Sequence, residues 1–226
     1  MQLTAFISYA TADKHIAGQV KAVLNDHGIA AFLAHDDIHV SQEWKDRLIQ
    51  ELNETIIFVP LLSVSFKESD WAPQEIGMAL TRKDMLFIPL SVDGTVPFGF
   101  ISNIQGKRIP ANGMYRDLLL EPIMTHFTHE ILPTLIERLA GASSFLNAEA
   151  LMLPLVRHFD KFNDEEIDRF ATASIENNQI WDEHQCRQQH LPAFLKLHRS
   201  RMDPEKLKAL EYQVKHRQWY HSRMDI

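Results

Sequence analysis

The stretch TIIFVPLL, residues 55–62, decides the fold. It is apolar at nearly every position, so a strand built from it carries apolar side chains on both faces. A strand of this kind is typical of the centre of a parallel sheet that is covered by helices on both sides. We therefore predict a central parallel strand here, and the segments on either side must supply its neighbours.

Three further apolar runs flank this strand, at residues 3–9 (LTAFISY), 29–34 (IAAFLA) and 85–92 (MLFIPLSV). Segments of helical period separate the runs. One places Ile16, Val20, Val23 and Leu24 on a single face and stops at Gly28; a second, capped by Ser41, has Trp44, Leu48, Ile49 and Leu52 on its inner face. Alternation of strand and helix predicts an α/β fold, a flavodoxin-like doubly wound parallel sheet. Arg108 and Ile109 are expected on a short fifth strand, and residues 122–139 on a closing helix.

The strand signals stop at about Gly141. From there Asn163 or Asp164 and the pair Asp203–Pro204 mark the starts of helices. We predict an α/β domain over residues 1–140 and an all-helical C-terminal module over 141–226. Burial is expected at the apolar positions Phe159, Phe162, Ile167, Phe170, Ile175 and Ile180.

Composition limits the function. The chain has 23 Lys and Arg against 30 Asp and Glu, a net charge of −7, so it lacks the basic excess typical of nucleic-acid binding. The single cysteine, Cys186, forms no intrachain disulfide, which favours a reducing compartment. No signal-peptide pattern and no run of about 20 apolar residues is present. We expect a cytoplasmic protein without membrane or nucleic-acid partners.

Ligands of open parallel sheets bind at the carboxyl ends of the strands. Here those ends carry Ser8 and Tyr9, then Asp36 and Asp37, and then Ser63. Neither G-x-G-x-x-G nor a P-loop occurs, which argues against dinucleotide-fold and P-loop binding. Ser63 occupies the position at which a receiver domain needs a phosphorylated aspartate. The histidine pairs at 35/39 and 126/129 lack the spacing of a zinc motif, so no metal is expected.

The segment FKESDWAPQEIGMAL, residues 66–80, contains the residue pair of greatest interest. Trp71 precedes Glu75 by four residues, with Pro73 between them. A glutamate in a first helical turn is common, because the helix dipole stabilises it by ~0.3–1 kcal/mol. Glu75 is therefore either an ordinary first-turn carboxylate or a catalytic group.

Four blocks together resemble a known family. AFISYATAD (5–13), FLAHDDIHVSQEWKDRLIQEL (32–52), IIFVPLLSVSFKESDWAPQEIGMAL (56–80) and FIPLSVD (87–93) are similar to bacterial Toll/interleukin-1 receptor (TIR) domains. The blocks occur in the family's order and spacing, and the resemblance covers about residues 1–140. The form HDDI followed by S-x-E-W is similar to TIR proteins of antiphage systems such as Thoeris.

The resemblance implies an activity. Enzymatic TIR domains cleave NAD+ between nicotinamide and ribose with a glutamate four residues after a tryptophan, positions that correspond to Glu75 and Trp71. One carboxylate suffices because nicotinamide leaves as a neutral pyridine, unlike the leaving group of ordinary glycoside hydrolysis, which needs an acid. NAD+ is then the substrate, and no other cofactor is expected. The product is ADP-ribose or a cyclised ADP-ribose, and a downstream effector could read a cyclic product as a signal.

The same resemblance implies further site residues. Ser8 and Tyr9 match positions beneath the ribose. Asp36, Asp37 and Trp44 match a loop and helix start that close the site and contact a neighbouring protomer, so self-association through residues 35–44 is expected. Trp44 could equally be a core anchor, and the two aspartates a solvated turn. Two other functions stay open: a non-catalytic TIR scaffold that self-associates, and a nucleoside or nucleotide N-glycosidase.

Overall fold

The computed structural model describes residues 3–34, 42–111, 113 and 115–215, with the side chains of 42–44 excepted. The chain divides into two compact units, residues 1–126 and 127–226. The expected boundary lay at 140/141. The expected closing helix over residues 122–139 is two helices, α5 (Arg116–His126) and α6 (Thr128–Ala140), separated at Phe127, and the break between the units falls there.

The first unit is an α/β sheet. Its strands are β1 (Thr4–Ser8), β2 (Ala30–Leu33), β3 (Ile57–Leu62), β4 (Leu86–Phe87), β5 (Leu90–Ser91) and β6 (Lys107–Arg108). All pairings are parallel, in the order β2-β1-β3-β5-β6, with β4 also paired to β3. This arrangement confirms the predicted flavodoxin-like sheet with β3 at its centre, and β6 overlaps the expected fifth strand.

The expected fourth strand, 85–92, is divided into β4 and β5. The registers Phe58↔Phe87 and Leu61↔Leu90 place Pro89 beside Pro60. The carbonyls of Phe58 and Leu62 accept the N–H groups of Ile88 and Val92, so Pro60 lies between them on the same edge of β3. Proline has no N–H to donate, so the ladder is interrupted at Pro60.

One face of the sheet carries a row of phenylalanine rings at a single register. Phe6 is aligned with Phe32 and with Phe58, and Phe58 with Phe87. Their ring centroids lie 5.4, 5.8 and 5.2 Å apart in that order across the sheet. The row crosses four strands and forms the floor of the core on this face.

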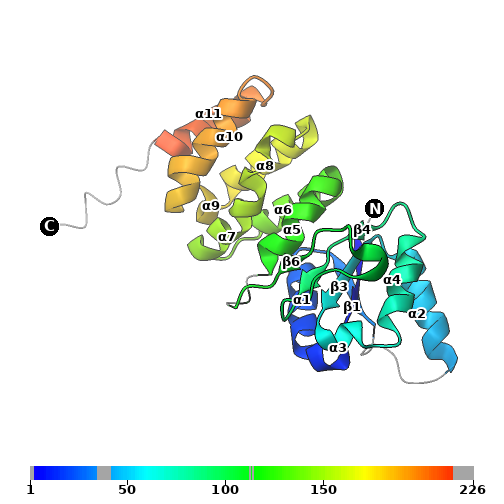
Figure 1. Cartoon of the computed structure of the whole chain (residues 1–226). Coiled ribbons are helices and arrows are strands. Elements are labelled where there is room, and N and C mark those ends of the chain that lie inside the picture. The colour runs from blue at the N-terminus through cyan, green and yellow to red at the C-terminus, as the bar shows by residue number, and fades with distance from the viewer. Residues whose placement is uncertain (1–2, 35–41, 112, 114, 216–226) are drawn as a thin grey trace. The chain divides into compact units, whose positions relative to one another are not determined.

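Helices cover both faces (Figure 1). The helices α2 (Gln42–Glu54), α3 (Val64–Lys67) and α4 (Ala72–Leu80) pack their buried residues on the phenylalanine row. Leu48 and Leu52 of α2 are buried as expected, and Ile49 is half-buried. The helix α1 (Lys14–Asp26) follows the short η1 (Thr11–Asp13) and packs against β1, β2 and α5 on the other side. It ends before Gly28, which adopts the positive φ of 76° that glycine tolerates.

The second unit is helical, as predicted for the C-terminal part. It contains α6, α7 (Phe145–Val156), η3 (Phe159–Lys161), α8 (Asp164–Glu176), α9 (Asn178–Trp181), the π-helical turn η4 (Cys186–His190), α10 (Leu191–His198) and α11 (Pro204–Lys215). Asn163 caps α8 in a capping box with Glu166, and Asp203 caps α11, which confirms both predicted starts. The expected apolar positions are buried, except that Ile175 is half-buried.

Candidate functional site

The candidate site lies where the strand order of the sheet reverses. Because all the strands are parallel, the carboxyl ends of β1, β3 and β5 lie on one edge. The chain proceeds outward from β1 to β2 in one direction and to β3 in the other, so the crevice between β1 and β3 is the switch point of the sheet. Ser8 ends β1 at this edge, and α4 packs over the adjoining face.

Glu75 occupies an apolar position of α4. The buried residues of this helix are Ala72, Glu75, Ile76 and Ala79, at the spacing of one helical face. Three of them belong to the core over the phenylalanine row, and Glu75 lies on the same face with only 2% of its surface exposed. A solvated first-turn carboxylate would lie on the opposite face, so the geometry disfavours that interpretation.

The two carboxylate oxygens of Glu75 differ in their partners. Oε2 accepts a hydrogen bond from the Ser8 hydroxyl, which is itself fully buried. Oε1 is buried and has no hydrogen-bond partner among the described residues. Burial disfavours the charged form and raises the pKa of Glu75 to about 7, although the Ser8 hydrogen bond acts in the lowering direction. A carboxyl group that titrates near neutral pH is a common feature of catalytic sites.

Trp71 lies immediately before α4. Its carbonyl accepts the backbone N–H groups of Gln74 and Glu75, each at 3.0 Å, so it is the last residue outside the helix. Trp71 is 38% exposed, whereas Glu75 one turn later is buried. The segment therefore pairs an accessible aromatic side chain with a buried acid.

The other predicted site residues are placed less completely. Tyr9 follows Ser8 directly, and its side chain is buried. Asp36 and Asp37 lie outside the described residues, and Trp44 lies in α2 with a side chain that is not described. The structure thus brings Ser8 and Glu75 together, and the roles of all the predicted site residues stay predictions.

Comparison with known families agrees with this geometry. The sequence model of the TIR domain family matches residues 5–115, a range that contains almost all of the parallel sheet and every predicted site residue. Residues 5–115 are a TIR domain. No curated protein sequence matches it.

A second serine–carboxylate pair in the TIR domain was not predicted from the sequence. The Ser63 hydroxyl, directly after β3, donates to Asp13 Oδ2 at 2.6 Å and accepts the N–H of Phe66 at 3.0 Å. Both members of the pair are buried. It ties η1 to the end of β3 across the switch point and caps α3. Capping could have been inferred from a serine before a short helix, but the partner fifty residues away could not.

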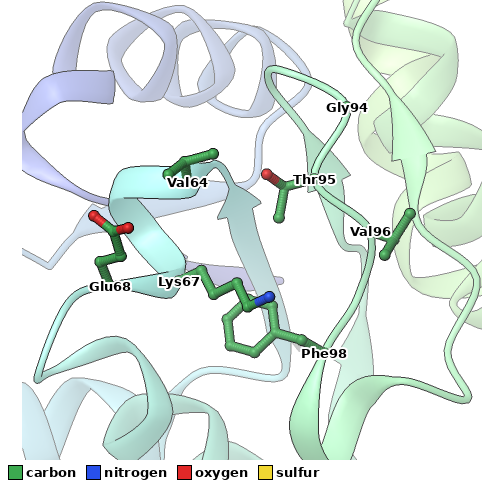
Figure 2. A pocket seen from close by; sticks show the side chains of 7 residues that line it. All are labelled: Val64, Lys67, Glu68, Gly94, Thr95, Val96 and Phe98. Carbon is green, nitrogen blue, oxygen red and sulfur yellow. The ribbon is translucent and has the colours of Figure 1, made fainter.

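A pocket of about 530 Å³ opens farther along the same edge of the TIR domain (Figure 2). It lies between α3 and the loop after β5, and Lys67 Nζ lies 5.9 Å from the centre of the Phe98 ring. Glu75 is not among the lining residues, so this pocket does not contain the candidate acid. Its lining residues are Val64, Lys67, Glu68, Gly94, Thr95, Val96 and Phe98.

Asp93 joins the two walls of this pocket. Its carboxylate accepts the Thr95 hydroxyl at 2.6 Å and the backbone N–H groups of Val64 and Thr95 at 2.9 Å each. These bonds, that from the Thr95 hydroxyl first, lower the pKa of Asp93 to about 2. A charged, hydrogen-bonded side chain therefore fixes the two walls of the pocket to each other.

Two further features bear on metals and membranes. Within the described part of the chain, no group of three or more His, Cys, Asp or Glu side chains is arranged to hold a metal ion. In the same residues, no helix has the length and apolar character that crossing a membrane requires.

Proposed function

We propose that this TIR domain protein cleaves the bond between nicotinamide and ribose in NAD+ with Glu75 as the catalytic residue. The observation that carries the proposal is the state of Glu75: a buried carboxyl at the switch point of the sheet, with a pKa raised to about 7 and one oxygen without a partner among the described residues. The tryptophan that precedes it by one turn supports the assignment.

The chemistry needs one carboxylate. The C–N bond breaks with its electron pair going to nicotinamide, which leaves as a neutral molecule and needs no proton. The ribose left behind has the character of an oxocarbenium ion, and a fixed anion beside it stabilises the transition state. Water then adds to the anomeric carbon and loses its proton, or an adenine nitrogen adds instead and gives a cyclic product.

The raised pKa of Glu75 suits this reaction once substrate is bound. The nicotinamide ring of NAD+ carries a positive charge, and an adjacent positive charge lowers the pKa of a carboxyl group. Binding NAD+ therefore favours the anionic form that the reaction requires. Because Glu75 is 2% exposed, the ribose reaches Oε1 only after the groups over it are displaced.

The remaining roles follow the family resemblance. The exposed indole of Trp71 offers a flat face to a planar ring, and Tyr9, Asp36, Asp37 and Trp44 complete the proposed substrate site. Self-association through residues 35–44 and a place in antiphage defence belong to the same proposal. A cyclic product would serve as a signal for a separate effector.

The test is direct. Purified protein is incubated with NAD+, with and without a crowding agent, and nicotinamide and ADP-ribose products are separated by chromatography. Nicotinamide release with equimolar linear or cyclic ADP-ribose supports the proposal. Cleavage of nucleosides or nucleotides in place of NAD+ would identify an N-glycosidase instead.

A self-associating scaffold is the second candidate, and exposed apolar side chains favour it. Phe100 is 84% exposed, Val96 71% and Val64 57%, all on segments that follow β3 and β5. Large exposed apolar side chains often mark protein contacts. Concentration-dependent assembly in sedimentation experiments, together with no release of nicotinamide at any concentration, would establish this function.

A further inference from the structure

The hydrogen bond between Ser8 and Glu75 crosses from the sheet to the helix. Ser8 has the same parity as Phe6 in β1, so both side chains point to the face that α4 covers. Glu75 lies on the inner face of α4. The bond therefore joins two rigid elements, and neither side chain can turn away without leaving a buried polar atom unpaired.

The bond also makes the two oxygens of Glu75 inequivalent. Oε2 is occupied by Ser8, whereas Oε1 has no partner among the described residues. A buried acceptor without a donor is costly. A hydroxyl or a positive charge that arrives beside Oε1 would relieve that cost, so Oε1 is the oxygen that can accept a hydrogen bond from a substrate.

We infer that Ser8 is a positioning residue that holds Glu75 through Oε2 and leaves Oε1 to face the ribose. The inference rests on the proposed function and differs from the expectation that Ser8 binds the substrate itself. A serine hydroxyl has one proton, and here that proton is donated to Glu75, so it is not available to the ribose.

A consequence distinguishes this role from substrate binding. Hydrogen bonding to the charged form of a carboxyl lowers its pKa, and Ser8 acts on Glu75 in this direction. Removal of the hydroxyl should therefore raise the pKa of Glu75 further above 7. A residue that contacts only the substrate would leave the pKa of the free enzyme unchanged.

The experiment compares Ser8→Ala, Ser8→Cys and Ser63→Ala in the full chain. For Ser8→Ala we expect the pH midpoint of kcat/KM for NAD+ to rise by about one unit, as loss of a hydrogen bond to a carboxylate implies. At pH 7 the ionised fraction of Glu75 falls from about one half to about one tenth, so kcat/KM should fall about fivefold. Ser8→Cys, which retains a weaker donor of similar size, should give an intermediate midpoint.

Ser63→Ala is the matched control. It also removes a buried serine hydroxyl that donates to a carboxylate at the same edge of the sheet, but that carboxylate belongs to Asp13. It should lower stability without moving the pH midpoint. A raised KM in Ser8→Ala with an unchanged midpoint would overturn the inference and make Ser8 a substrate-binding residue.

A second readout needs no activity. The Glu75 carboxyl carbon is titrated by NMR in protein labelled with ¹³C-glutamate, with Glu75→Gln used to assign the signal. If the wild-type protein cleaves no NAD+, the proposed function fails, and this titration alone decides the role of Ser8. A rise of the Glu75 pKa in Ser8→Ala supports the positioning role, and an equal pKa in both proteins refutes it.

Discussion

Two glutamates, one in each unit of the molecule, are buried equally but bonded differently. Glu75 in the TIR unit is 2% exposed, and Glu166 in the helical unit is 1% exposed. For Glu166, Oε2 accepts the backbone N–H of Asn163 at 2.8 Å, and Oε1 lies 2.9 Å from His129 Nδ1. For Glu75, only Oε2 has a partner among the described residues.

The difference separates a structural acid from a candidate catalytic one. Both oxygens of Glu166 are satisfied, and the residue ties the first turn of α8 to α6. Buried polar groups in proteins are normally satisfied in this way, and an exception needs an explanation. The exception at Glu75 lies at the switch point of a parallel sheet, where ligands of such folds bind.

The largest expected effect comes from neutralising each acid in turn. Glu75→Gln keeps the shape of the side chain but removes its charge, so the rate of NAD+ cleavage should fall by ~10²–10³. Glu166→Gln should leave turnover at the wild-type level. Nicotinamide release is measured for both variants by chromatography, and circular dichroism confirms their folds. Wild-type turnover in Glu75→Gln would remove the proposed mechanism.

The second effect concerns the boundary between the two regions. The helix α6 buries five apolar side chains and packs against α7 and α8 of the helical unit. Truncation after Ala140 removes α7 and α8 and therefore leaves the apolar face of α6 exposed. We expect residues 1–126 to be monodisperse and residues 1–140 to self-associate or precipitate. Light scattering on both fragments checks this, and the opposite result would support a boundary near residue 140. The five side chains belong to Ile131, Leu132, Leu135, Ile136 and Leu139.

The third effect is on stability. Glu166→Ala removes the capping box of α8 and leaves the N–H of Asn163 without its partner, which should cost ~1–3 kcal/mol in the free energy of unfolding. Glu75→Gln should not be destabilising at pH 8, because it removes a charge that burial disfavours. Urea unfolding of both variants at pH 8 measures the contrast. If Glu75→Gln lowered the free energy of unfolding as much as Glu166→Ala does, Glu75 too would be a structural residue.

The smallest effect is on the pH dependence of stability, to which His198 in the helical unit and Glu75 in the TIR unit contribute with opposite signs. His198 is buried against Phe162 and Phe194, and burial lowers its pKa. His198 therefore binds a proton more tightly in the unfolded chain than in the folded unit. As pH falls below about 6.5, His198 should destabilise the fold. Glu75, with a raised pKa, contributes stability at low pH that is lost as pH rises from 4.5 to about 7.

Melting temperatures at pH 5.5 and 7.5 test this dependence. Glutamine can retain a donor for the Phe159 carbonyl, which lies 2.7 Å from His198 Nε2, and it does not titrate in this range. His198→Gln should therefore reduce the loss of stability between pH 7.5 and pH 5.5. Glu75→Gln should increase that loss, because it removes a group that stabilises the fold at low pH. An equal pH dependence in wild type and His198→Gln would show that other groups govern it.

Local sequence determined the order of the elements. The apolar run at 55–62 is the central strand because its side chains alternate between two faces that are both covered. Asn163 and Asp203 begin helices because their side chains satisfy backbone N–H groups only three residues away or fewer. The spacing of Trp71 and Glu75 is equally local, so the amino-acid sequence is sufficient to find the pair.

Only the tertiary structure decided what those elements do. The phase of α4 against the sheet places Glu75 in the core, and its partner Ser8 lies 67 positions away in the sequence. Pro60 of β3 interrupts the ladder to the expected fourth strand, and the break at Phe127 divides the closing helix. Residues brought together by strand register or helix packing have no fixed spacing along the chain. Their contacts, and the pKa of Glu75 that depends on them, arise only when the chain has folded.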